Sequence, residues 1–143
     1  PATTSNDIQA KYECSMFDAW NATLIKARLL FDAGCYEECI LLLDSVPTEL
    51  LTAIQANEYA YRMGRACHKL ERYAQAKEFY QKAIDRRLEN TLYYPCYSAF
   101  YIGTIYNDEG NFAEAEKYFK MCQKMSSPIY GESIHLNARR AMQ

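Results

Sequence analysis

The residues best suited to chemistry in this sequence are six cysteines, at positions 14, 35, 39, 67, 96 and 122. Cys35 and Cys39 are one helical turn apart and could supply two corners of a tetrahedral zinc site. The sequence holds no second pair at metal-ligand spacing, so we expect no metal ion. Cys67 and His68 are adjacent, and adjacent side chains on a helix point about 100° apart, which prevents them from acting together as nucleophile and base.

Other sequence patterns of a catalytic site are also missing. The sequence contains no glycine-rich phosphate-binding loop, no evident pair of catalytic carboxylates and no Ser/His/Asp arrangement. For neither His68 nor His135 does the sequence show a catalytic partner. We therefore predict a non-catalytic protein without a cofactor.

Length and charge narrow the possible partners. The chain has 143 residues, enough for one domain with a hydrophobic core. Its net charge of -2 argues against nucleic acid as the partner, because phosphate binding needs concentrated positive charge. The longest apolar run, residues 39–43, is far shorter than the roughly 20 residues that span a bilayer, so we expect no membrane insertion. No signal-peptide pattern is visible, and free thiols favour a cytoplasmic location. Because the sequence begins with Pro1, we expect a piece of a longer protein.

The spacing of apolar residues predicts an all-α protein. Apolar side chains recur every three or four residues along nearly the whole chain, and no stretch alternates with the period of two that a strand requires. Pro95 should lie in the first turn of its helix, and Ser127 should cap a helix that begins with Pro128. Breaks between helices are predicted at Gly34, residues 46–47, residues 71–72, residues 87–91, residues 110–111 and residues 126–128.

An internal repeat appears when Gly64 is aligned with Gly103. A glycine inside a helix costs about 1 kcal/mol relative to alanine, so two glycines in register indicate a close approach between helices. We expect Gly64 to let its helix lie against Ala76 and Ala83, while aromatic residues fill the wider gap to the next pair. The aligned pairs are Ala76 with Ala115, Tyr80 with Phe119 and Ala83 with Cys122, and a degenerate third copy surrounds Ala27.

These positions resemble the helix-turn-helix signature of the tetratricopeptide repeat, and the chain is similar to the C-terminal repeat segment of larger bacterial members of that family. The spacings here, 103 − 64 = 39 and 64 − 27 = 37, exceed the family repeat of about 34 residues. The resemblance implies a right-handed α-solenoid of about three helix-turn-helix repeats in a single domain, residues 1–143. Its approximate repeats are residues 17–46, 57–90 and 96–127, followed by a capping helix at residues 128–141.

The segment before the first repeat has two interpretations. Ile8, Tyr12, Met16 and Trp20 keep helical spacing, which favours one long first helix. The pattern Ser15-x-x-Asp18 is that of a capping box, which favours a break and makes residues 6–16 the tail of an upstream helix.

The resemblance also implies a binding surface, because the first helix of each repeat lines the concave face in this family. Arginines and aromatic residues at the implied positions are typical of binding hot spots, and the basic ones favour an acidic segment or a C-terminal carboxylate. The clamp with which chaperone-binding members hold a carboxylate is missing, since Leu24 and Arg28 occupy its first two positions. The implied residues are Leu24, Arg28, Phe31 and Asp32 in the first repeat, Tyr61, Arg65, His68 and Lys69 in the second, and Tyr97, Phe100, Thr104 and Asn107 in the third.

Three functions stay open at this point. The first is a non-catalytic interaction or scaffold module that binds a protein or peptide in the concave groove. The second is a structural segment of a longer solenoid that binds nothing by itself and whose inner face is solvated or filled by a neighbouring segment. The third is an accessory part of a larger regulator or enzyme whose chemistry lies upstream.

Overall fold

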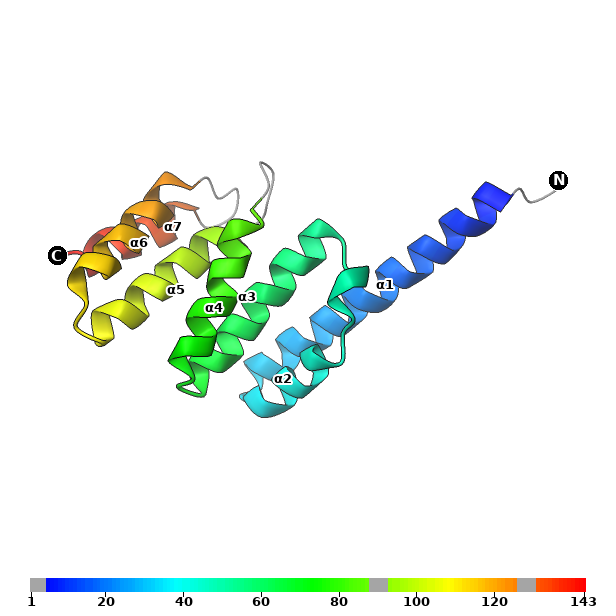
Figure 1. The fold of residues 1–143 in the computed structure, drawn as a ribbon, viewed down its shortest axis with the longest axis horizontal. Coiled ribbons are helices and arrows are strands. Elements are labelled where there is room, and N and C mark those ends of the chain that lie inside the picture. Colours follow the sequence, from blue (N-terminus) through cyan, green and yellow to red (C-terminus); the bar gives the residue numbers. More distant parts are fainter. Residues whose placement is uncertain (1–4, 88–92, 126–130) are drawn as a thin grey trace.

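The chain folds into a row of α-helices that follow one another along the long axis of the molecule (Figure 1). The computed structural model describes residues 5–87, 93–125 and 131–143, and for residues 5–18 it describes the backbone alone. These ranges contain no strand, which confirms the all-α prediction. The helices are α1 (Ser5–Asp32), α2 (Tyr36–Asp44), α3 (Ala53–Lys69), α4 (Tyr73–Asp85), α5 (Tyr94–Asp108), α6 (Phe112–Lys124) and α7 (Gly131–Ala141), with a short 3-10 helix η1 (Thr48–Leu50) between α2 and α3.

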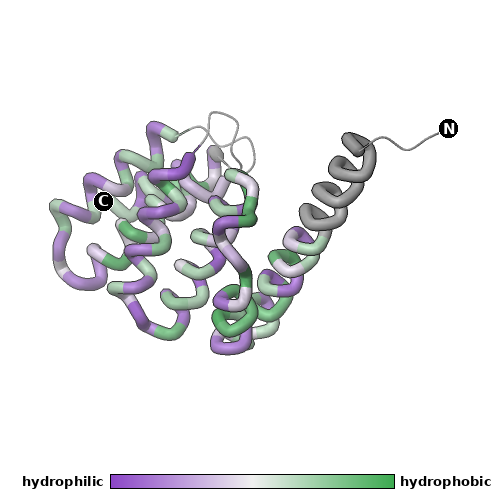
Figure 2. The backbone as a smooth tube through the Cα atoms, turned by 45° about the vertical axis from the view of Figure 1, so that its right-hand side comes forward, coloured by the Kyte–Doolittle hydropathy of each residue, from purple (hydrophilic) through white to green (hydrophobic). Residues whose placement is uncertain are grey.

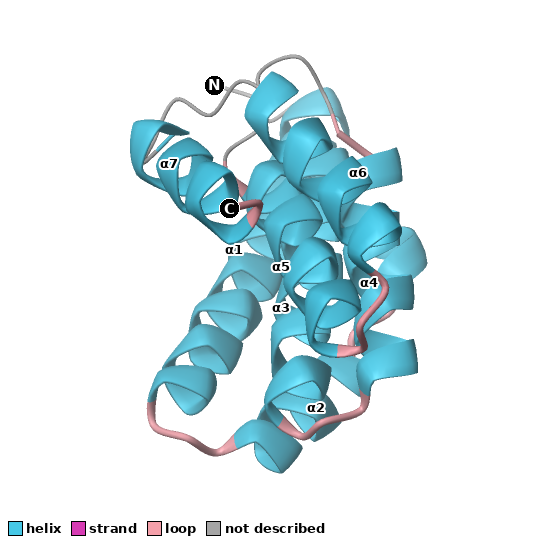
Figure 3. Ribbon diagram, turned by 90° about the vertical axis from the view of Figure 1, so that its left-hand side faces the viewer, coloured by secondary structure: helices cyan, strands magenta, loops and turns pink. Residues whose placement is uncertain are grey.

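The helices pair into hairpins that stack as an α-solenoid. The pairs are α1 with α2, α3 with α4 and α5 with α6, and each pair contacts the next. Figure 3 shows α1, α3 and α5 in one layer and α2, α4 and α6 in the other. The last helix, α7, packs on α5 and α6 at the C-terminal end of the row. Each predicted repeat overlaps one hairpin and omits the start of its first helix, and the limits of the repeats stay a prediction.

The turns inside the hairpins share one backbone conformation. Gly34, Glu71 and Gly110 have φ values of 81°, 59° and 80°, in the left-handed region that ends many helices. In each turn the N–H of the following residue donates to a carbonyl five residues earlier, at 2.8 to 2.9 Å. The repeat seen in the sequence is therefore also a repeat of turn geometry.

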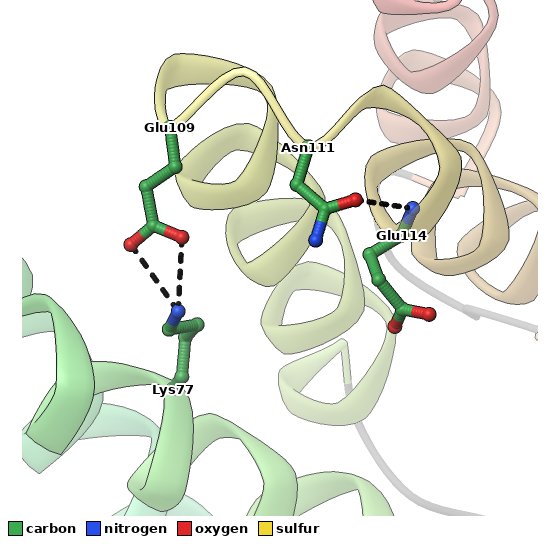
Figure 4. A network of polar contacts seen from close by, with 4 residues as sticks. All are labelled: Lys77, Glu109, Asn111 and Glu114. Atoms are coloured by element: carbon green, nitrogen blue, oxygen red, sulfur yellow. Dashed lines mark hydrogen bonds and ion pairs between the residues drawn. The ribbon is translucent and has the colours of Figure 1, made fainter.

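Polar side chains fix where several helices begin. Thr52 and Gln55 form a capping box at the start of α3, in which the Thr52 hydroxyl accepts from the Gln55 N–H and the Gln55 side chain accepts from the Thr52 N–H. The Asn111 side chain accepts from the Glu114 N–H at 3.4 Å and caps α6 (Figure 4). Pro95 lies in the first turn of α5, as predicted.

The two helical glycines accept aromatic rings from the second helix of their own hairpins. A Cβ atom on Gly64 would lie 2.6 Å from Tyr80 Cδ1, and one on Gly103 would lie 2.6 Å from Phe119 Cε1. The sequence prediction of a close approach is confirmed, but its partner was wrong. The nearest atoms belong to the aromatic ring sixteen residues later, not to Ala76 or Ala83. The ring fits between the two helices because glycine, at the opposing position, has no side chain.

The N-terminal helix is continuous, which agrees with the interpretation as one long first helix and not with a break at Ser15 and Asp18. The backbone of α1 runs as a helix from Ser5 to Asp32, and its N-terminal part extends beyond the stack (Figure 1). Helical periodicity through this region outweighs the capping-box pattern. Along the described chain, hydrophobic and hydrophilic residues alternate on the helices (Figure 2), as expected where one face of each helix is buried.

One face of α7 packs on the last hairpin. Ile134 and Ala138 lie on this face and are buried. Leu136 is 42% exposed, because it lies on the opposite side of α7. The predicted start of the cap at Ser127 and Pro128 lies outside the described residues.

Candidate partner-binding face

The layer formed by α1, α3 and α5 carries an arginine held between two aromatic rings. The Arg65 guanidinium carbon lies 4.0 Å from the centre of the Tyr101 ring and 5.1 Å from that of Phe31. Phe31 comes from α1, Arg65 from α3 and Tyr101 from α5. This contact therefore spans all three hairpins, and we call these three residues and His68 the inner-face cluster.

Arg65 is not neutralised by an acidic side chain within the described residues. Among the ion pairs found there, none includes Arg65. The side chain beside it that influences its pKa most strongly is that of Tyr101, and Tyr80 and Tyr61 act in the same direction. Cation–π contacts fix the plane of the guanidinium group but leave its net charge in place.

His68 completes the cluster and is held by the same tyrosines. Its Nδ1 lies 3.1 Å from the Tyr80 hydroxyl, and its ring is in edge contact with the rings of Tyr73, Tyr80 and Tyr101 at 5.8 to 5.9 Å. Burial lowers the pKa of His68 to about 4, and the nearby charges of Arg65 and Lys69 add to this effect. The ring is therefore neutral at pH 7.

A second group of tyrosines lies closer to the N-terminal ends of α3 and α5 than the inner-face cluster does. The Tyr61 ring contacts those of Tyr93 and Tyr94, with centroids 5.9 and 5.1 Å away. Arg62 lies over the rings of Tyr61 and Tyr94 and pairs with Glu58 at 3.4 Å. This arginine is neutralised within α3, which distinguishes it from Arg65. Tyr94 is buried and Tyr93 and Tyr97 are half-buried, so these aromatic residues pack between repeats and present little free surface.

The predicted binding residues fall into three groups in the structure. Phe31, Arg65 and His68 meet in the inner-face cluster, and Tyr97 and Phe100 adjoin it through ring contacts with Tyr101 at 6.3 and 5.5 Å. Arg28, Asp32 and Lys69 are exposed. Thr104, whose hydroxyl donates to the Phe100 carbonyl, and Asn107 are half-buried on α5.

Two of the residues implied by the resemblance present little surface. Leu24 is 2% exposed and Tyr61 is 6% exposed, because both pack into the core. Leu24 therefore does not face outward as expected. The centre of the Tyr61 ring lies 6.5 Å from that of Tyr80, and the Tyr80 hydroxyl in turn contacts His68 of the cluster.

Sequence reasoning missed Tyr101 as a member of the cluster. The positions implied by the resemblance do not include it, although 101 − 65 = 36 places it about one repeat after Arg65. That spacing is the available signal, because residues one repeat apart lie on neighbouring first helices.

The described side chains offer no metal site and no membrane span. No group of three or more His, Cys, Asp or Glu residues among them lies close enough together to hold a metal ion. No helix in the described part of the chain is both long enough and apolar enough to cross a bilayer.

The comparison with known families agrees with the repeat found in the sequence. Residues 58–90 and 100–128 each match the family model described as tetratricopeptide repeat. The matched segments contain most of the α3–α4 hairpin and most of the α5–α6 hairpin. No curated protein matches the chain.

Proposed function

Because this chain carries repeats of the tetratricopeptide family, we propose that it is an interaction module that binds an acidic protein segment at the inner-face cluster. Repeats of this family generally mediate protein–protein interaction or scaffolding, and they are typically non-catalytic. The proposal adds the location of the binding surface and the chemistry of the partner.

Arg65 is the observation that carries this proposal. A guanidinium group in contact with the rings of both Phe31 and Tyr101 is restricted in its position, so less side-chain entropy remains to be lost when it binds a carboxylate. With no acidic partner among the described residues, its charge is available to an external carboxylate, which it can bind through two parallel hydrogen bonds.

The charges around the cluster are predominantly positive. Arg28 on α1 and Lys69 on α3 are exposed near Phe31 and His68. Asp32 on α1 and Asp108 on α5 oppose them, and Asp108 lies close enough to raise the pKa of His68 slightly against the larger lowering effects. The position of Arg65 and the two exposed cations nearby favour an acidic partner over a basic one.

A second function, that of a segment within a longer solenoid, is favoured by the apolar surface of α1. Ile25 is 51% exposed and Leu29 is 56% exposed. The equivalent residues of α3, one repeat later, are Arg62 and Ala66, and both are buried. Because these positions are buried in the second repeat, a further hairpin packed against α1 would bury Ile25 and Leu29 in a similar way.

Binding of a defined acidic probe tests the proposal. A fluorescently labelled hexaglutamate peptide, titrated with the protein at low salt, should bind and raise the anisotropy, and a hexalysine peptide should not. Arg65→Gln should weaken hexaglutamate binding by about tenfold or more, the usual cost of losing a charge-assisted contact. Lys124→Gln removes the same charge from an exposed residue of α6 and should leave affinity unchanged. Equal affinities of the two variants would reject the inner-face cluster as the binding site.

A further inference from the structure

Two buried cysteines from neighbouring helices are in direct contact in the last hairpin. Cys96 lies near the start of α5 and Cys122 near the end of α6, and their Sγ atoms are 3.3 Å apart. Cys96 is 1% exposed and Cys122 is not exposed at all. Cys96 Sγ also lies 3.4 Å from the Cys122 carbonyl oxygen, to which it donates.

In the preceding repeat, the two equivalent residues are not cysteines and are joined by a hydrogen bond between the helices. Asn57 and Ala83 are the equivalents of Cys96 and Cys122, since 96 − 57 = 39 and 122 − 83 = 39. The Asn57 side chain donates to the Ala83 carbonyl at 2.6 Å, over the same separation of 26 residues. Cys96 thus keeps the bond to the opposite helix, and Cys122 adds a second sulfur that packing alone does not require.

We propose that Cys96 and Cys122 are a site of reversible oxidation, at which a peroxide converts the two thiols into a disulfide that links α5 to α6. The two sulfurs are in contact in the reduced fold, so bond formation needs only a small closing movement of the side chains. Because both sulfurs are buried, the oxidant enters by local opening of the hairpin.

The two thiols have different parts in this reaction. The hydrogen bond with Cys122 lowers the pKa of the Cys96 thiol against the effect of burial, and His135 on α7 lowers it further. The same hydrogen bond and burial raise the pKa of Cys122. Cys96 is therefore the thiol that ionises more readily and attacks first, and Cys122 is the thiol that resolves the product.

The reaction balances with one molecule of hydrogen peroxide. The Cys96 thiolate attacks a peroxide oxygen, the O–O bond breaks, and the departing hydroxide takes up a proton to become water. Cys122 sulfur then attacks the sulfur of the Cys96 sulfenic acid, the S–O bond breaks, and the released hydroxide takes the Cys122 proton. Two thiols are oxidised and one peroxide is reduced to two waters.

Peptide mapping after peroxide treatment tests this proposal. Trypsin separates the two cysteines, because Cys96 falls within residues 88–117 and Cys122 within residues 121–124. The reduced full chain, exposed to hydrogen peroxide, alkylated and digested without reductant, should give these two peptides linked and lighter by two hydrogen atoms. Dithiothreitol should release them, and the oxidised protein should melt at a higher temperature than the reduced one.

The preceding repeat supplies the matched control. The double variant Cys96→Asn/Cys122→Ala copies Asn57 and Ala83, a pair that this fold already accommodates. It should give no linked peptide, and peroxide should leave its melting temperature unchanged. Half-buried Cys35 reports in the same sample that the oxidant has acted. Oxidation of Cys35 without the linked pair, or a disulfide between other cysteines, would overturn the proposal.

Discussion

Glu71 has the same left-handed backbone conformation as Gly110, its equivalent one repeat later. Their φ values are 59° and 80°, and Gly34 adopts this conformation in the first hairpin at 81°. The three hairpin turns therefore have the same geometry, although a glycine stands in only two of them. A residue with a Cβ atom is strained in this region, which costs roughly 1 kcal/mol.

Replacing Glu71 with glycine should therefore stabilise the protein. We expect Glu71→Gly to raise the free energy of unfolding by about 0.5–1 kcal/mol, because relief of the strained backbone exceeds the added freedom of the unfolded chain. Urea denaturation measures this change. Glu71→Ala is the control, since it removes the carboxylate but keeps the Cβ atom. A gain equal to that of Glu71→Gly would show that the side chain, and not the backbone, is responsible.

Adding a methyl group at Gly64 should have the opposite effect. The new Cβ would lie 2.6 Å from the buried Tyr80 ring, so the helices must move apart or the ring must shift. We expect Gly64→Ala to cost about 1–3 kcal/mol, although alanine is the better helix former. The cost should shrink in a Tyr80→Leu background, where the ring is absent. An additive double variant would mean that the glycine does not serve the ring.

His68 should make the stability of the fold depend on pH. In the unfolded chain its pKa is about 6.5, and in the folded chain burial lowers the pKa to about 4. The unfolded state therefore takes up the proton first as the pH falls. The contribution of neutral His68 to stability is complete above pH 6.5 and is lost between pH 6.5 and pH 4.

The His68→Asn variant isolates this contribution, because asparagine is the equivalent residue, Asn107, in the next repeat. Arg65, Lys69 and Asp108, the charges that act on His68, stay in place in this variant. Urea denaturation at pH 7 and pH 5 should show that the wild-type protein loses more stability than His68→Asn between the two values. Identical losses would place the pH dependence in other groups.

The ion pair between Lys77 and Glu109 should contribute little. It joins α4 to the end of α5 at 3.1 Å (Figure 4), and the Lys77 amine also lies 4.3 Å from the centre of the Tyr106 ring. Because Glu109 is exposed, we expect Glu109→Gln to cost less than about 1 kcal/mol and the difference to fade in molar salt. A larger, salt-independent loss would mean that Glu109 does more than neutralise Lys77.

Much of the fold could be predicted from the sequence because the repeat restricts it. Gly64 and Gly103 with their aligned alanines and aromatics identify the hairpins, and Gly34 and Gly110 mark two of the turns. Glu71 marks the third turn only through the repeat, since its residue type gives no signal. At Ser15 the sequence alone supported both a continuous helix and a break, and α1 is continuous because a short capping pattern is weaker than sustained helical periodicity.

The inner-face cluster was predicted only in part. Repeat offsets place Phe31, Arg65 and His68 on first helices, and the structure brings them together. The offsets could not separate outward residues from packed ones, because a rotation of the helix by a few tens of degrees decides whether Leu24 or Tyr61 is buried. Tyr101 was missed because it lies on a side of α5 that also carries core residues. That same side faces Arg65.

The proposed binding surface is tested most directly by following the Arg65 side chain during titration with an acidic probe. In an NMR spectrum of the 15N-labelled full chain, the Nε–Hε signal of Arg65 is assigned by its absence in Arg65→Gln. We predict that hexaglutamate shifts this signal in a saturable manner, and that the Nε–Hε signal of Arg62, already paired with Glu58, moves much less. An unmoved Arg65 signal at concentrations where hexaglutamate is bound would contradict the proposed site.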